Sequence, residues 1–203
     1  MLKTRIIPCL DVIKNKVVKG VNFKNIKVMG NAVEMAKNYS LSGADELCML
    51  DINASYQNRK TFIKTVEAIA KVINIPLTVG GGVSTLSDIT DLLNAGADKV
   101  SINSAAVKNP KIIKQASLRH GSQCIVVAID AKRYENQMRV VVKGGREITG
   151  KELVSWAKKV QLLGAGEILL TSMDTDGVQN GFDSTMLKKV TNNVSLPVIA
   201  SGG

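Results

Sequence analysis

Two aspartates, Asp11 and Asp130, each end an apolar segment that is typical of a buried strand. Strand-like and helix-like segments alternate along the chain, which predicts parallel strands. Active sites of proteins built this way lie at the carboxyl ends of the strands. Two carboxylates that face each other there suit general acid–base chemistry, because one can give a proton while the other takes one. Each aspartate could instead cap the loop after it, but their equivalent placement favours catalysis.

Glycine-rich segments end two further predicted strands, Ile75–Gly82 (IPLTVGGG) and Leu196–Gly203 (LPVIASGG). Glycines let backbone N–H groups approach an anion closely, since no Cβ intervenes. Two such loops suggest a ligand with two phosphates. Polar residues after neighbouring strands extend the two predicted anion sites, which comprise Gly81, Gly82, Asn103 and Ser104 in one and Thr171, Asp174, Asp176, Gly177, Gly202 and Gly203 in the other. Lys19 could reach over the ligand or be a solvated loop lysine.

The order of elements predicts an α/β fold. The predicted strands are Arg5–Asp11, Glu46–Asp51, Leu77–Val79, Lys99–Asn103, Ile125–Asp130, Glu167–Thr171 and Val198–Ser201, and the predicted helices are 31–42, 60–73, 85–95, 109–118, 150–163 and 183–192. A small hairpin is expected after the first and the fifth strand.

The two parts of the chain resemble each other at a shift of about 120 positions. This repeat predicts a single (βα)8 TIM-barrel domain over 1–203, with a first half-barrel at 1–120 and a partial second one at 121–203. The sequence ends at the seventh strand, whereas such barrels typically have about 250 residues. We therefore expect a truncated chain that lacks about 50 C-terminal residues.

Charged residues occupy the early positions of four predicted strands: Arg5, Glu46, Lys99 and Glu167. In a barrel they would point into its interior at the amino end of the strands. Buried charges are costly unless they pair with one another, so two cations and two anions are expected to form a ring. The ring could be a polar gate through the floor of the barrel or a structural layer of salt bridges.

Composition excludes several classes of function. The net charge of +10 could indicate nucleic-acid binding, but only 3% of residues are aromatic and the lysines are spread along the chain. Solvated helix faces explain this charge, with steering of an anionic substrate as the alternative. No transmembrane or signal-type apolar run is present, so a cytoplasmic location is expected. Cys9, Cys48 and Cys124 are predicted to be reduced core residues, His120 is expected to be structural, and no metal site or cofactor is expected.

Several segments together resemble one known family. They include Arg5–Val12 (RIIPCLDV), Val17–Gly20 (VVKG), Thr78–Gly82 (TVGGG), Ala97–Asn103 (ADKVSIN), Gly121–Lys132 (GSQCIVVAIDAK), Gly164–Thr171 (GAGEILLT) and Ile199–Gly203 (IASGG). Over all 203 residues the chain is similar to the cyclase subunit of imidazole glycerol phosphate synthase, a lyase of histidine biosynthesis.

The resemblance implies a reaction and a partner. The substrate would be the open-chain ribulosyl-formimino aminoimidazole carboxamide nucleotide (PRFAR), a bisphosphate, and a glutaminase subunit would supply ammonia in a heterodimer. Asp11 and Asp130 would carry the acid–base steps, Lys19 would lie on a mobile loop, and ammonia would pass a gate formed by Arg5, Glu46, Lys99 and Glu167. Two alternatives remain at this point. One is an inactive barrel that binds phosphates or a partner subunit, and the other is a paralogue that delivers ammonia to a surface sugar.

Overall fold

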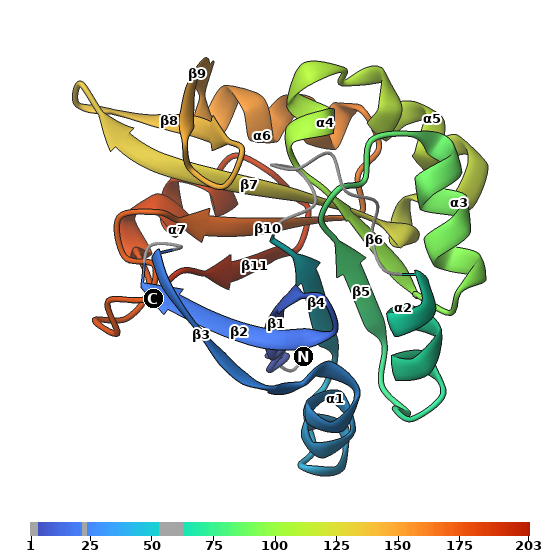
Figure 1. The fold of residues 1–203 in the computed structure, drawn as a ribbon. Coiled ribbons are helices and arrows are strands. Elements are labelled where there is room, and N and C mark those ends of the chain that lie inside the picture. The colour runs from blue at the N-terminus through green and yellow to red at the C-terminus, as the bar shows by residue number, and fades with distance from the viewer. Residues whose placement is uncertain (1–3, 22–23, 53–62) are drawn as a thin grey trace. The chain divides into compact units, whose positions relative to one another are not determined.

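Strands and helices alternate along the chain, as the sequence predicts (Figure 1). The structure is a computed structural model that describes residues 4–21, 24–52 and 63–203. By its contacts the chain divides into two units, Met1–Lys19 with Ile26–Ser101 and Gly20–Asn25 with Ile102–Gly203. This division differs from the predicted half-barrels, whose boundary at residue 120 stays a prediction.

The first unit is built on four parallel strands that pair in the order β1, β4, β5, β6. Their bounds are Cys9–Ile13, Leu47–Asp51, Leu77–Gly80 and Lys99–Ile102. Ile102, the last residue of β6, is assigned to the second unit. Helices α1, α2 and α3 lie along one face of this sheet (Figure 1), with bounds Ala32–Leu41, Ile63–Ala70 and Leu86–Asn94. The start of the predicted helix 60–73 lies outside the described residues.

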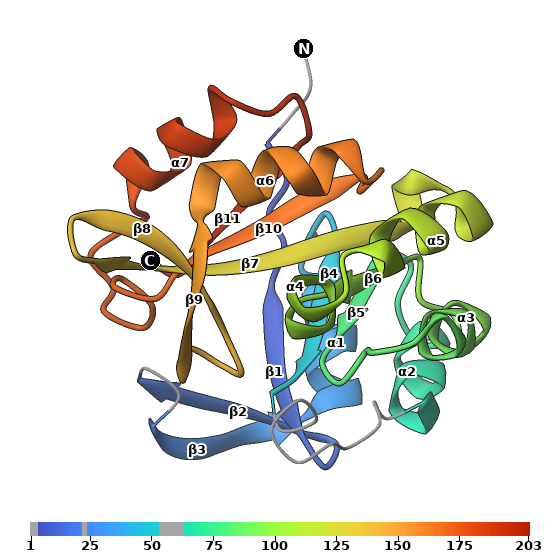
Figure 2. The ribbon, with the colours of Figure 1, turned by 90° about the horizontal axis from the view of Figure 1, so that it is seen from above.

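The second unit has three parallel strands that pair in the order β7, β10, β11. Their bounds are Ile125–Tyr134, Glu167–Ser172 and Val198–Ser201. Two antiparallel strands, β8 (Gln137–Val142) and β9 (Glu147–Glu152), extend the sheet from β7. Helices α6 (Leu153–Leu162) and α7 (Ser184–Thr191) cover one face (Figure 2). The unit also contains α4 (Ser104–Lys108), α5 (Lys111–His120) and the short 3-10 helix Ser122–Cys124.

Both predicted hairpins are present, and both close in the same way. The first joins β1 to β2 (Lys16–Val21), which precedes β3 (Lys24–Asn31), and the second joins β7 to β8. Each has a two-residue loop whose residues both have positive φ, at 47° and 64° for Lys14-Asn15 and at 46° and 60° for Glu135-Asn136. This is the type I′ turn that matches the twist of paired strands.

Apolar residues of the parallel strands form the core of each unit. All four residues of β5 are buried, as are the first five of β7. Among the described residues, no helix has both the length and the apolar character that a membrane-crossing segment needs.

Three predictions about local structure are wrong. The predicted helix 150–163 begins only at Leu153, because β9 continues to Glu152 and the Glu152 carboxylate accepts hydrogen bonds from the N–H groups of Val154 and Ser155. The first strand begins at Cys9 rather than Arg5. Of the three cysteines, none of which forms a disulfide, only Cys48 is buried, while Cys9 is exposed and Cys124 lies half-buried at the end of the 3-10 helix.

Candidate active site

Asp130 lies at the centre of a polar group in the second unit. Its position in β7 is in register with Val141 of β8 and Thr171 of β10. The side chain of Asn103, the residue after β6, donates a hydrogen bond of 2.8 Å from Nδ2 to Oδ2 of Asp130. The sequence predicts both residues at strand ends, and the structure brings them into direct contact.

The surroundings of Asp130 keep its carboxyl group partly protonated near neutral pH. Burial raises its pKa to about 6, the negative charge of Asp176 adds to that rise, and hydrogen bonds from Asn103 and Thr171 oppose it. Burial also raises the pKa of Asp176. A carboxyl group with a pKa this close to neutrality can both accept and return a proton during a reaction cycle.

Two polar atoms in this region are buried without a partner among the described residues. They are Oδ1 of Asn103 and Oγ of Ser172, the last residue of β10. A buried polar atom that has no partner costs free energy unless a ligand or water satisfies it. Asn103 is itself a predicted anion-binding residue, and Ser172 lies between Thr171 and Asp174 of the other predicted anion site, so a bound ligand would have polar atoms available to it.

The loops that follow β10 and β11 are joined, as the sequence predicts. The hydroxyl group of Thr175 donates a hydrogen bond to the carbonyl oxygen of Gly202. Gly202 has a φ of 77°, and a Cβ there would lie 2.6 Å from the carbonyl oxygen of Ser172. Only glycine allows the chain to approach the end of β10 this closely. Asp176 and Gly177 therefore share a loop cluster with Gly202 and Gly203.

The first unit repeats this arrangement at the end of β5. Gly81 has a φ of 92°, and a Cβ there would lie 2.2 Å from the carbonyl oxygen of Asp51. Asp51 ends β4 just as Ser172 ends β10. In both units a glycine loop thus lies against the end of the neighbouring strand, β4 for Gly81 and β10 for Gly202. The sequence motifs alone do not reveal this contact.

Strand register places the two predicted catalytic aspartates at equivalent levels. In the first unit Asp11 is level with Leu50, Gly80 and Ser101 across four neighbouring strands. In the second unit Asp130 is level with Thr171 and Ser201. In each unit the glycine loop begins one residue after the strand residue that is level with the aspartate, at Gly81 after Gly80 and at Gly202 after Ser201. Asp11 and Asp130 lie in different units, so their opposition across one site stays a prediction.

Lys19 lies in strand β2, where its side chain is exposed, rather than in a loop. The equivalent hairpin of the second unit carries Lys143 directly after β8. The pairing of Val12 with Val17 puts Asp11 level with Val18, so Lys19 is one residue beyond the partner of Asp11. Asp130 pairs with Val141, so Lys143 is two residues beyond the partner of Asp130.

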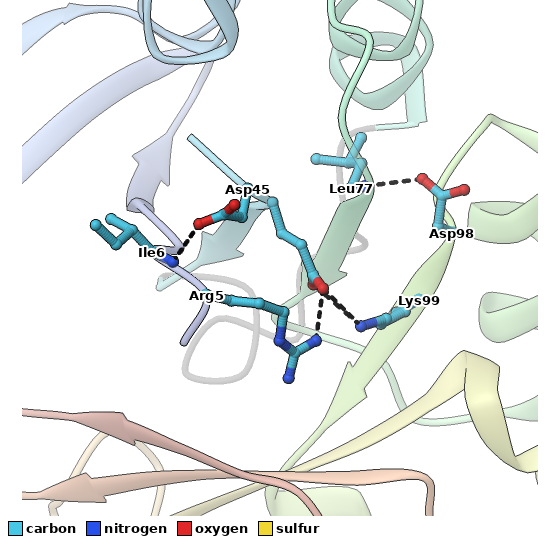
Figure 3. A network of polar contacts seen from close by, with 7 residues as sticks. Arg5, Ile6, Asp45, Leu77, Asp98 and Lys99 are labelled. Carbon is cyan, nitrogen blue, oxygen red and sulfur yellow. Dashed lines mark hydrogen bonds and ion pairs between the residues drawn. The ribbon is translucent and has the colours of Figure 1, made fainter. Parts of the chain in front are cut away.

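Three of the four predicted gate residues form a network in the first unit (Figure 3). The Glu46 carboxylate, whose side chain is 8% exposed, contacts Nη1 of Arg5 at 2.5 Å and Nζ of Lys99 at 3.0 Å. Glu167, the fourth residue, is buried at the start of β10 in the second unit. The prediction that these charges pair is therefore confirmed for Arg5, Glu46 and Lys99.

Two aspartates that the site prediction omits hold the strand ends beside this network. Asp45 accepts a 2.7 Å hydrogen bond from the N–H of Ile6, and Asp98 accepts one of 2.8 Å from the N–H of Leu77 (Figure 3). Their own N–H groups donate to the carbonyl oxygens of the same two residues. The repeated tripeptide Gly-Ala-Asp, which precedes β4 and β6, is the sequence signal that could have identified them.

The described residues contain no group of three or more His, Cys, Asp or Glu side chains that could hold a metal ion. His120 ends α5 and is half-buried.

A family model described as histidine biosynthesis protein matches residues 5–203. The chain belongs to this family. The predicted α/β barrel class, here with seven parallel strands in its described part, is thereby confirmed.

Two curated relatives carry the same name. The chain is 59% identical to the imidazole glycerol phosphate synthase subunit HisF of Prochlorococcus marinus strain MIT 9515, over 100% of this chain and 80% of the relative. It is 58% identical to the subunit HisF of Prochlorococcus marinus subsp. pastoris strain CCMP1986, over 100% of this chain and 81% of the relative. These relatives are named as subunits of a synthase.

Proposed function

We propose that the protein is the cyclase subunit of imidazole glycerol phosphate synthase. It combines ammonia with the bisphosphate PRFAR and releases imidazole glycerol phosphate and the aminoimidazole carboxamide ribotide (AICAR). The observation that carries the proposal is the 59% identity to a HisF subunit over the whole chain. The Asp130 carboxyl group, whose pKa is raised to about 6, gives the second unit a group suited to the proton transfers of this reaction.

Asp11 and Asp130 carry the acid–base steps of the proposed mechanism. Attack by ammonia, release of AICAR through its amino nitrogen and ring closure each require a proton to be removed from one atom and given to another. Asp130 serves as the base when ionised and as the acid once it has accepted the proton. The equivalent level of Asp11 in its own unit supports an equivalent role for it.

Two glycine loops bind the two phosphates in this proposal. Gly81 and Gly82 act with Asn103 and Ser104 on one phosphate. Thr171, Asp176 and Gly177 act with Gly202 and Gly203 on the other. The close approach of Gly81 and Gly202 to neighbouring strand ends supports this assignment, because it leaves backbone N–H groups of these loops without side chains in front of them. Lys19 supplies a positive charge from β2.

A glutaminase subunit delivers ammonia in the proposed heterodimer, and the cytoplasm is the proposed location. Arg5, Glu46, Lys99 and Glu167 form the gate that ammonia passes. The support is the buried position of Glu46 between two cations, since the Glu46 carboxylate stays paired with one cation when the other moves away. We also propose that 1–120 and 121–203 are the two half-barrels, which the matching type I′ hairpins support.

Asp11→Asn tests the function and the assignment together. Purified protein is supplied with PRFAR and ammonium salts, and both products are quantified by chromatography. The wild-type protein should form them in equal amounts, whereas Asp11→Asn should bind substrate with a Kd within about two-fold of the wild type and form neither product. Asp91→Asn, which removes an exposed carboxylate from α3 in the same unit, is the control. An Asp11→Asn variant with near-normal turnover contradicts the catalytic role.

A further inference from the structure

The four-residue loop Lys143–Arg146, which joins β8 to β9, carries two cations and begins two residues after Val141, the residue of β8 that pairs with Asp130. Lys143, Gly144 and Gly145 all have positive φ, at 56°, 65° and 77°. Two glycines make this tight path possible, and the guanidinium group of Arg146 donates a 2.9 Å hydrogen bond to the carbonyl oxygen of Lys143 across the turn. The loop is therefore a defined structure with a fixed position for the Lys143 backbone.

Contacts on two sides hold this loop against the candidate active site of the second unit. The backbone N–H of Lys143 donates a 3.1 Å hydrogen bond to Oγ of Ser104, the residue after Asn103. On the other side, the Cε atom of Met173, the residue after β10, lies 2.5 Å from the place where a Cβ on Gly145 would stand. The loop thus touches both segments that flank Asp130, namely those that follow β6 and β10.

The charge of Lys143 is held by a partner that a ligand could replace. Its Nζ lies 2.6 Å from Oε2 of Glu147, and the two side chains are 58% and 53% exposed. Exposed ion pairs contribute little to folding stability, so breaking this one costs the protein little. A dianionic phosphate offers more charge and more acceptor oxygens than a carboxylate does.

The need for a cation here follows from the carboxylates nearby. Asp130 and Asp176 carry negative charge in the same unit and interact with each other. An incoming phosphate would be repelled by the Asp130 carboxylate unless a positive charge lay close to it.

We propose that Lys143 binds a phosphate group of the substrate from the β8–β9 loop, with Glu147 as the internal competitor that the phosphate displaces. This inference rests on the proposed function for the identity of the substrate, but it predicts an anion site that can be tested without it. Arg146 is the positioning residue, because it fixes the carbonyl group of Lys143.

The test combines two probes with a double-mutant cycle. Inorganic phosphate binding is measured by calorimetric titration, and the KM for PRFAR is measured with ammonia as the second substrate. One unit charge about 4 Å away in aqueous surroundings is worth about a five-fold change in affinity. Lys143→Gln should therefore raise the Kd for phosphate and the KM about five-fold and leave kcat within about two-fold. Glu147→Gln should lower both constants, and it should have no effect in a chain that also carries Lys143→Gln.

Lys158→Gln is the matched control, since it removes the same charge from an exposed position of α6 in the same unit. Gly145→Ala keeps both charges but places a Cβ at a residue with a φ of 77°, so strain in the loop should also weaken phosphate binding. Gly150→Ala, whose added Cβ has only its chain neighbours within 4 Å, should not.

The outcomes separate this inference from the proposed function. Phosphate binding that depends on Lys143 in a protein that forms no product supports the anion site and counts against the cyclase. The inference is overturned if the protein turns over normally and Lys143→Gln has the same Kd for phosphate and the same KM for PRFAR as Lys158→Gln. That result leaves the proposed cyclase function intact. An equal effect of Glu147→Gln with and without Lys143 also overturns it.

Discussion

Removal of the Asn103 side-chain amide should make Asp130 a weaker acid. Asn103 donates a 2.8 Å hydrogen bond to the Asp130 carboxylate, and this bond lowers a pKa that burial raises to about 6. A hydrogen bond to a charged group contributes about 1.5–3 kcal/mol, and one pKa unit corresponds to about 1.4 kcal/mol. Asn103→Leu keeps the branched shape of the side chain but not the donor, so the pKa of Asp130 should rise by about one to two units.

Asp176→Asn should move the same pKa in the opposite direction. The negative charge of Asp176 raises the pKa of Asp130, so its removal should lower that value below about 6. Opposite shifts from two neighbouring substitutions cannot come from a general loosening of the fold. This contrast makes the pair more informative than either variant alone.

Carbon-13 NMR of labelled aspartate carboxyl groups measures these shifts directly, with Asp130→Asn used to assign the resonance. The pH dependence of kcat/KM in the ammonia-dependent reaction should show its ionisation limb move with the NMR value. Asn109→Leu, which changes an exposed asparagine after α4, is the control and should leave the limb in place. A pKa that stays unchanged in Asn103→Leu, or one that rises in Asp176→Asn, would refute the electrostatic account of this site.

Three further predictions concern the first unit. Asp88→Asn should lower the free energy of unfolding by about 1 kcal/mol at neutral pH in urea titrations, because Asp88 forms the capping box of α3, while Asp91→Asn on the same helix should change it little. Burial opposes ionisation of Asp88, but hydrogen bonds from Ser84 and Thr85 prevail and lower its pKa below the usual 3.8, so its contribution should be present above that pH and be lost as the pH falls through the lowered pKa. Gly81→Ala should destabilise by about 3 kcal/mol because its Cβ would strike the backbone of β4, whereas Gly43→Ala, with positive φ but open space, should cost about 1 kcal/mol; equal losses would refute the close-approach argument. Lys99→Met should reduce product formed per glutamine hydrolysed in the complex with the glutaminase, and unchanged coupling would reduce the ion network to a structural role.

Local sequence patterns predict the parallel strands well, because each is a short apolar run that ends in glycine or a polar residue. The strand Val198–Ser201 is predicted with its observed bounds. Pairing of Glu46 with Arg5 and Lys99 is also predictable, since charges at the start of buried strands must find partners.

Features that depend on strand register are out of reach of such patterns. The Asn103–Asp130 hydrogen bond depends on how far β6 and β7 are shifted along each other, and the spacing of residues in the sequence does not fix this shift. The same limit applies to the contact between Lys143 and Ser104. The strand Glu147–Glu152 is missed for a different reason, because its residues continue into a helical pattern and only the capping role of Glu152 marks the boundary.

The most direct test of the central claim is the rate at which imidazole glycerol phosphate forms from PRFAR and ammonium, measured for the wild-type protein and for Asp130→Asn. The account predicts steady turnover by the wild type and a loss of at least about 100-fold in kcat for Asp130→Asn, because a general acid–base group contributes about that much or more. Substrate affinity should stay within about two-fold, since the asparagine retains the acceptor for Asn103. Near-normal turnover by Asp130→Asn, with intact binding, would contradict the proposed mechanism.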